Sequence, residues 1–285
     1  MRLVRSTAAT TGIAWCVMGR IAGAQIAGIG VDPHIVVLTP GKPGAALTVM
    51  NPHTTTATFS VDLHFGYATT DSLGQSRVEL RDGPDTASAA GWVTPFPRTF
   101  TLAAGASRTL RLLATPPIGL ADGEYWARLT LHARDAAPLA VLTDSAAQAP
   151  RVHIAVETAM VLPVFFRKGP VSTGIDVDTL DAVLDGDTVE VRASLHRTGV
   201  AAFLGVAHVI VRDRTGTSVA TLDRQLAVYR ASAPRWRIPL AHHDPAARYT
   251  IALVLSTNRR DVDRGVVLQA PPVMRVALVR PTDGS

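Results

Sequence analysis

Apolar and polar residues alternate at every second position through much of this chain. The alternation is clearest in four segments, residues 59–65, 125–131, 189–195 and 236–240. Such a period places one row of side chains on a core and the next row in water, which is typical of antiparallel strands. No stretch keeps a 3.6-residue period over several turns. The pattern therefore predicts an all-β protein.

Turn-forming residues separate the alternating segments. The chain of 285 residues contains 22 Gly and 19 Pro, spread along its whole length, which suits many short strands joined by turns. Clear turn signals are Asn51-Pro52, Asp122-Gly123 and Asp185-Gly186-Asp187. Glu and Lys, which favour surface helices, occur only four times and twice, so the composition argues against a helical bundle.

The first residues have the features of a secretory signal peptide. Two arginines precede a largely apolar run over residues 7–18, and Ala22-Gly23-Ala24 offers the small residues that a signal peptidase requires. We expect cleavage before Gln25 and a mature chain without cysteine, because Cys16 is the single cysteine. Removal of this segment lowers the formal net charge from +5 to +2, which weakens any case for nucleic-acid binding.

The remaining chain divides into two halves. A predicted strand ends at Arg167-Lys168, and the Gly169-Pro170 that follows interrupts the pattern. Each half places a tyrosine soon after an aspartate in the turn before a late strand, a recurrent feature of immunoglobulin-like sandwiches. These pairs are Asp122 with Tyr125 and Asp244 with Tyr249. We predict a signal peptide over residues 1–24 and two tandem immunoglobulin-like β-sandwiches over residues 25–168 and 169–285.

The sequence contains none of the common catalytic motifs. Gly-x-Ser-x-Gly, Walker, His-Glu-x-x-His and Gly-x-Gly-x-x-Gly patterns are absent, and the four Glu lie far apart in the sequence. His242-His243-Asp244 resembles a metal-binding cluster, but neighbouring side chains of an extended segment point in opposite directions. An exposed turn is the better interpretation. We predict no enzymatic activity, no cofactor and no metal.

Four motifs of the first half occur in a specific order. The opening strands cover residues 31–38 and 46–52, and a Pro-Arg, apolar, Gly, Arg-apolar pattern follows over residues 97–112. Asp122-Gly123-Glu124-Tyr125 comes next, and a strand then leads through Pro163-Val164-Phe165-Phe166-Arg167 into the second half. In this order the motifs resemble the first domain of periplasmic pilus (fimbrial) assembly chaperones.

The resemblance implies a periplasmic protein that works by β-strand donation. Chaperones of this family lend the last strand of their first domain to a pilus subunit whose own sandwich lacks a strand. By resemblance the donated side chains are Val152, Ile154 and Val156, and Leu139 and Val141 in the preceding loop extend the apolar contacts. The implied partners are exported pilus-like subunits, an outer-membrane usher, and a second copy of the chain that caps the strand in a homodimer.

The expected carboxylate anchor of that family is missing. Its members carry an Arg in the first strand and a Lys late in the donated strand, which together hold the terminal carboxylate of the subunit. Here the first position is Ile35, and residues 155–166 contain no basic residue. The anchor is therefore unassigned, with Arg128 and Arg167 as the displaced arginines to consider.

Two other classes of function fit the same sequence. The sandwiches could be self-contained structural or adhesion modules of the cell envelope, in which case the predicted donor residues line their own core. A carbohydrate-binding sandwich is a third hypothesis, but Trp92, Trp126 and Trp236 are scattered and predict no exposed aromatic platform. We favour the strand-donating chaperone.

Overall fold

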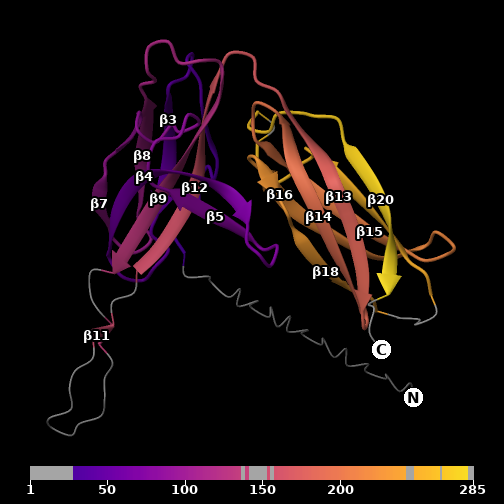
Figure 1. Cartoon of the computed structure of the whole chain (residues 1–285). Coiled ribbons are helices and arrows are strands. Elements are labelled where there is room, and N and C mark those ends of the chain that lie inside the picture. Colours follow the sequence, from indigo (N-terminus) through magenta and orange to yellow (C-terminus); the bar gives the residue numbers. More distant parts are fainter. Residues whose placement is uncertain are drawn as a thin grey trace, which may run out of the picture.

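The chain folds into two β-sandwiches that lie side by side (Figure 1). The structure is a computed structural model that describes residues 28–135, 139–140, 153–154, 157–241, 247–263 and 265–281. Within these ranges the chain forms strands and turns but no helix, and so no helix that could cross a membrane. The predicted signal peptide lies outside the described residues. The all-β prediction is confirmed.

The first sandwich consists of two sheets around one core. One sheet has the order β1-β3-β8-β6, with β1 (Gly30–Asp32), β3 (Gly44–Met50), β8 (Ser107–Ala114) and β6 (Val93–Phe96). The other has the order β2-β12-β9-β4-β5, with β2 (Val36–Leu38), β12 (Glu157–Lys168), β9 (Gly123–Asp135), β4 (Ala57–Thr70) and β5 (Ser76–Arg81). A further strand, β7 (Thr99–Leu102), pairs with β4. If the strands are lettered in chain order, the two sheets have the A-B-E-D and G-F-C arrangement of an immunoglobulin fold.

The second sandwich has the same arrangement. On one side β13 (Thr173–Asp185) pairs with β14 (Thr188–Gly199), which also pairs with β17 (Ala231–Ser232) and β18 (Arg235–Pro239). On the other side lie β16 (Ser218–Val228), β15 (Phe203–Arg212), β19 (Thr250–Ser256) and β20 (Val273–Pro281). The end of β13 pairs in parallel with β20 and joins the two sheets. Two immunoglobulin-like sandwiches in tandem are thus confirmed.

Alternating apolar residues form the two cores, as the sequence pattern predicts. Phe59 is fully buried on β4 and stacks on Phe100 of β7, with ring centroids 5.3 Å apart. The predicted tyrosine corner is present in the first sandwich, because the Tyr125 hydroxyl donates a hydrogen bond of 2.9 Å to the Ala121 carbonyl. Tyr249 is buried in the second sandwich, whereas Asp244 and the neighbouring histidines lie outside the described residues.

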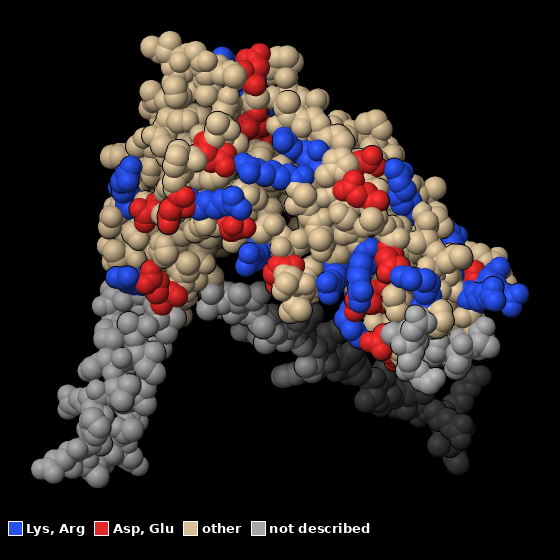
Figure 2. Space-filling model, viewed as in Figure 1, with Lys and Arg blue, Asp and Glu red and all other residues tan. Residues whose placement is uncertain are grey.

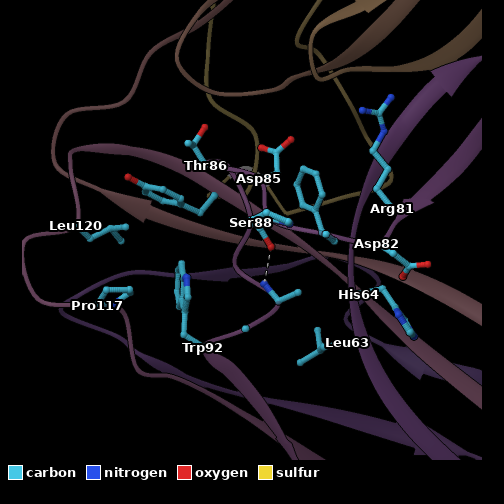
Figure 3. A pocket seen from close by; sticks show the side chains of 16 residues that line it. Leu63, His64, Arg81, Asp82, Asp85, Thr86, Ser88, Trp92, Pro117 and Leu120 are labelled. Carbon is cyan, nitrogen blue, oxygen red and sulfur yellow. Dashed lines mark hydrogen bonds between the residues drawn. The ribbon is translucent and has the colours of Figure 1, made fainter.

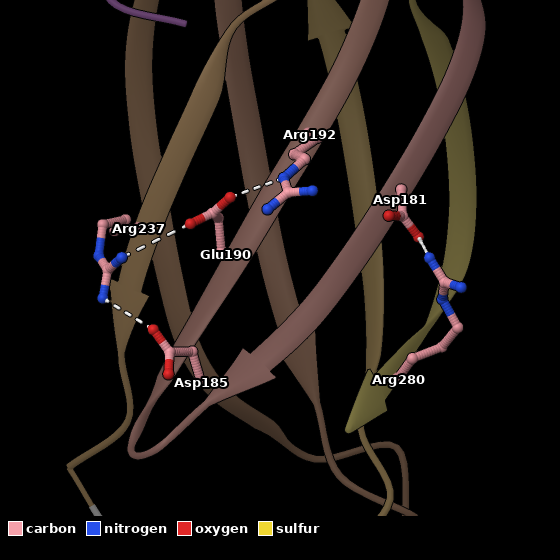
Figure 4. Close-up of polar contacts among 6 residues, drawn as sticks. All are labelled: Asp181, Asp185, Glu190, Arg192, Arg237 and Arg280. Carbon is pink, nitrogen blue, oxygen red and sulfur yellow. Dashed lines mark hydrogen bonds and ion pairs between the residues drawn. The ribbon is translucent and has the colours of Figure 1, made fainter. Parts of the chain in front are cut away.

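On the face of the molecule seen in Figure 2, Lys and Arg side chains are interspersed with Asp and Glu. On the outer face of β13, β14 and β18, Arg237 lies 3.5 Å from both Asp185 and Glu190, and Glu190 also accepts a hydrogen bond of 2.6 Å from Arg192 (Figure 4). Exposed ion pairs of this kind contribute at most about 1 kcal/mol each. These ion pairs keep the face polar and hydrated, and they contribute little to the stability of the sandwich.

One face of β9 departs from the sequence prediction. The alternation predicts that Trp126, Arg128 and Thr130 lie in water, but each is no more than 4% exposed. Trp126 and Arg128 are covered by Tyr229 of the second sandwich, which contacts both side chains. The period-two pattern is correct, but the polar row lies at a junction between domains rather than in solvent.

Candidate functional site

The last strand of the first sandwich leaves most of one edge open. β12 pairs with β9 along its whole length, from Glu157 to Lys168. On its other side β2 pairs with only three residues, Val164 to Phe166. In the described part of the chain, no strand lies along residues 157–163 on that side. Their backbone groups therefore form an edge to which another strand can pair.

Side chains along β12 alternate between the core of the first sandwich and the opposite face of the sheet. Leu162, Val164 and Phe166 are buried in the first core, and Met160 packs against it. In the sequence, the predicted donor residues Val152, Ile154 and Val156 precede β12 at the same two-residue spacing.

The predicted donor residues are only partly described. Ile154 belongs to β11 (His153–Ile154), which pairs antiparallel with β10 (Leu139–Ala140), and Ile154 is opposite Leu139. These two strands form a sheet of their own, separate from the sandwich sheets. Val152, Val156 and Val141 lie outside the described residues. Their role as donors stays a prediction.

An ion cluster holds the start of β12. Both Nε and Nη2 of Arg134 lie 3.0 Å from Oε2 of Glu157, and Nδ1 of His132 lies 2.9 Å from Oε1. The hydrogen bonds from Arg134, with the charges of Arg134 and His132, hold the pKa of Glu157 below its usual value. The cluster attaches the exposed first residue of β12 to the neighbouring strand.

An aromatic cluster joins the two sandwiches at the other end of β12. Tyr229 is fully buried there, with its ring centroid 5.0 Å from Trp126, 5.9 Å from Phe165 and 6.1 Å from Tyr67. Burial raises the pKa of the Tyr229 phenol to about 12, because the charged phenolate would lose its hydration. The junction is therefore a packed core shared by the two domains.

A buried carboxylate, Glu124, fixes this junction. Its side chain is 0% exposed and accepts a hydrogen bond of 2.8 Å from Nε of Arg167. Its second oxygen accepts hydrogen bonds from Nε1 of Trp126 at 3.0 Å and from the backbone N–H of Ala202 at 2.8 Å. Ala202 belongs to the second sandwich, so this one carboxylate binds both domains. Sequence reasoning missed it, although a lone Glu at the start of a buried strand was a usable signal.

Arg128 and Arg167, the two arginines considered as an alternative anchor, differ in whether they keep an unpaired hydrogen-bond donor. Arg167 is committed to Glu124, and its side chain is 8% exposed. Arg128 donates a hydrogen bond of 3.2 Å to the Gly66 carbonyl and stacks on Tyr229, with its Cζ 4.9 Å from the ring centroid. Among the residues that the structure describes, neither Nη2 of Arg128 nor the neighbouring Thr130 hydroxyl, both buried, has a hydrogen-bond partner. Of the two arginines, Arg128 keeps a donor, but an anion reaches it only if the junction opens.

The position expected to carry the first-strand Arg is apolar in space as well as in sequence. Ile35 packs against the aromatic junction cluster. It also lines a cleft of about 1010 Å³ between the domains, together with Lys42, Arg111 and Asp263. These charged side chains do not lie at the positions where the resemblance to pilus chaperones leads us to expect the anchoring Arg and Lys.

The tip of the β4–β5 hairpin forms a second contact between the domains. The Thr70 hydroxyl accepts a hydrogen bond of 2.8 Å from the Ala233 N–H, and the Gly74 carbonyl accepts one of 3.2 Å from the Arg235 N–H. Gly74 has a φ of +73°, and a Cβ there would lie 2.4 Å from Cγ of Arg235. Only glycine satisfies both constraints. A third contact is the ion pair between Arg230 and Asp85 at 2.8 Å.

Among the described residues, no three His, Cys, Asp or Glu side chains are grouped so that they could hold a metal ion. His242 and His243 lie outside that part of the chain.

Comparison with known proteins gives structural matches only. No protein-family model matches the chain, and no curated protein shows significant sequence similarity to it. Among solved structures, the CsuC–CsuE chaperone–tip adhesin pre-assembly complex of Acinetobacter baumannii matches at 12% identity and a TM-score of 0.40, over 74% of this chain and 90% of that chain.

Two further matches are of the same kind. The Salmonella enterica SafA pilin in complex with the SafB chaperone matches at 14% identity and a TM-score of 0.40, over 90% of this chain and 99% of that chain. The E. coli chaperone DraB matches at 13% identity and a TM-score of 0.37, over 78% and 88% of the two chains. The fold assignment given above rests on the strand order of this chain itself.

Proposed function

We propose that this chain is an exported, periplasmic chaperone-like protein that binds pilus-type subunits by β-strand donation. The subunit has an incomplete immunoglobulin fold, and the protein delivers it to an outer-membrane usher. The single observation that carries the proposal is the open edge of β12 along residues 157–163, which adjoins the buried row of Leu162, Val164 and Phe166.

The physical basis is the pairing of a free strand edge with an unfinished sheet. Main-chain hydrogen bonds between the strands supply affinity, and alternate apolar side chains in pockets of the subunit set the register. Each buried Val or Ile side chain contributes roughly 1.5–3 kcal/mol before the cost of ordering the strand. Val152, Ile154 and Val156 would each add such a contribution to the main-chain hydrogen bonds.

Replacement of Ile154 by Asp tests the proposal. The tagged full chain is expressed with its export signal, and periplasmic proteins that bind it are identified by mass spectrometry. We expect a strand-deficient immunoglobulin-type subunit to bind the wild type and not Ile154→Asp, because a carboxylate cannot enter an apolar pocket without a large desolvation cost. Circular dichroism should show that the variant is folded.

A matched control is Ala159→Asp. Ala159 is exposed and belongs to the opposite row of β12, so this variant should stay folded and keep its partner. If Ile154→Asp still captures the subunit, Ile154 is not a donor. If it unfolds, the side chain belongs to its own core, and the self-contained envelope module becomes the better hypothesis.

A further inference from the structure

A pocket of about 690 Å³ opens on the side of the first sandwich, away from the edge of β12. It is bounded by β4, the connection from β5 to β6, and the turn that precedes β9. Trp92, Pro117 and Leu120 form one wall, Arg81, Asp82 and His64 lie opposite, and Ser88 and Asp85 lie between them (Figure 3). Its volume lies in the usual range of small-molecule sites.

The floor and one wall of the pocket are apolar and rigid. Leu63, Phe65 and Tyr125 contribute to the floor. The Trp92 ring is held by edge-to-face contacts with Phe166 and Tyr125, whose centroids lie 4.9 and 5.9 Å away. Trp126 and Trp236 are buried, whereas Trp92 is partly exposed. Trp92 is therefore the partly exposed tryptophan at this pocket.

The loop that carries the polar residues is also held in place. The Ala89 N–H donates to the Trp126 carbonyl at 2.8 Å, and the Trp126 N–H donates to the Ala87 carbonyl at 2.7 Å. Oδ1 of Asp85 accepts a hydrogen bond of 2.9 Å from the Ala87 N–H. The loop is therefore attached to β9 by backbone hydrogen bonds, and the pocket is formed before any ligand arrives.

Several polar groups at this pocket have no partner among the described residues. They are the Asp82 carboxylate, the His64 imidazole, the Thr86 hydroxyl and the indole N–H of Trp92. The other charged groups are already neutralised, since Asp85 binds Arg230 at 2.8 Å and Arg81 binds Glu79 at 3.0 Å. What remains is a mixture of donors and acceptors beside an aromatic wall, with one free carboxylate.

From this combination we infer that the pocket binds a neutral carbohydrate. A sugar ring offers hydroxyl groups that donate to a carboxylate and accept from an indole N–H, and its C–H face packs on aromatic and apolar side chains. An anionic ligand is disfavoured by Asp82, because Arg81 and Asp85 are each paired and leave no free positive charge at the pocket to offset it. This site is independent of strand donation and uses none of its residues.

Titration of the full chain with neutral sugars tests the inference. Glucose, galactose, mannose, N-acetylglucosamine and maltose are added in turn, followed by tryptophan fluorescence and by calorimetry. We expect saturable binding of at least one sugar, weakened about tenfold or more by Asp82→Asn and by Trp92→Phe, which removes the indole N–H but keeps an aromatic ring. Glucose 6-phosphate should bind more weakly than glucose, because its charge meets the Asp82 carboxylate.

The matched control is Asp62→Asn. Asp62 is exposed on the same strand as His64 but does not line the pocket, so this variant should bind sugar as the wild type does. The inference is overturned if no neutral sugar gives saturable binding, if only glucose 6-phosphate binds, or if Asp82→Asn and Asp62→Asn bind equally well.

Discussion

Glu124 and Arg167 face each other in register on β9 and β12, and their side chains form an ion pair of 2.8 Å that is almost completely buried. A buried pair of this kind is sensitive to the loss of one partner, because the other charge is then left without compensation. Since Glu124 also accepts the Ala202 N–H, the same loss reaches the second sandwich.

We therefore expect Glu124→Gln to destabilise the protein by about 3 kcal/mol or more. The measurement is the urea midpoint followed by circular dichroism. Glu79→Gln removes an exposed carboxylate that pairs with Arg81, and it should change stability by less than about 1 kcal/mol. Equal effects of the two substitutions would contradict the role of Glu124 at the junction.

Tyr229 predicts a loss of stability at high pH. Its folded pKa is raised to about 12, so the stabilisation from the neutral phenol is complete below pH 10 and is lost as pH rises toward 12. Absorbance at 295 nm should show a tyrosine that ionises near pH 12, together with unfolding. Tyr229→Phe should remove that ionisation step, and a variant that retains it would show that another tyrosine is responsible.

Glu157 predicts an acid-dependent loosening at the start of β12. Its folded pKa lies below the ordinary value of 4.5, so the stabilisation is present above that value and is lost as pH falls through the lower folded pKa. Amide exchange of residues 158–160, corrected for the intrinsic rate, should therefore increase between pH 5 and pH 3. In Glu157→Gln the pH dependence should disappear.

A control for this acid effect is Asp213→Asn. Asp213 is a partly exposed carboxylate whose pKa is likewise lowered by hydrogen bonds from Thr215, but it lies in the turn between β15 and β16. It should leave exchange at β12 unchanged. An effect of Asp213→Asn on β12 would mean that acid acts on the whole fold instead.

Gly74→Ala should loosen the contact between the hairpin tip and the second sandwich. The substitution combines an unfavourable positive φ with a clash against Arg235, so we expect a cost above the roughly 1 kcal/mol that φ alone imposes. Gly216→Ala is the control, because Gly216 has a φ of +84° but open space around it. Amide exchange at Ala233 and Arg235 should increase only in Gly74→Ala.

Period-two alternation predicted the strands and both sandwiches, because burial of one face is a local property that each strand carries in its own sequence. It did not predict where the second face of β9 would lie. Trp126 and Arg128 resemble the exposed row of any half-buried strand, and they become buried only because Tyr229, about 100 residues away in sequence, packs on them.

The polar site residues were harder to predict for the same reason. Glu124 was visible as one of four glutamates, but its partners Arg167 and Ala202 come from distant strands. Asp82 and Trp92 both belong to the connection from β5 to β6, and the cavity that they line is completed by β4 and the turn before β9. The donor row at Val152, Ile154 and Val156 came from resemblance and still awaits its test.

β12 contributes to both the open strand edge and the junction between the domains. Its open edge begins at Glu157, and its other end is held in the junction by Arg167. A subunit strand that pairs with this edge would be oriented by the second sandwich as well as by the first. The angle between the sandwiches would then select subunits by shape. A subunit that pairs with the edge but clashes with the second sandwich would not bind.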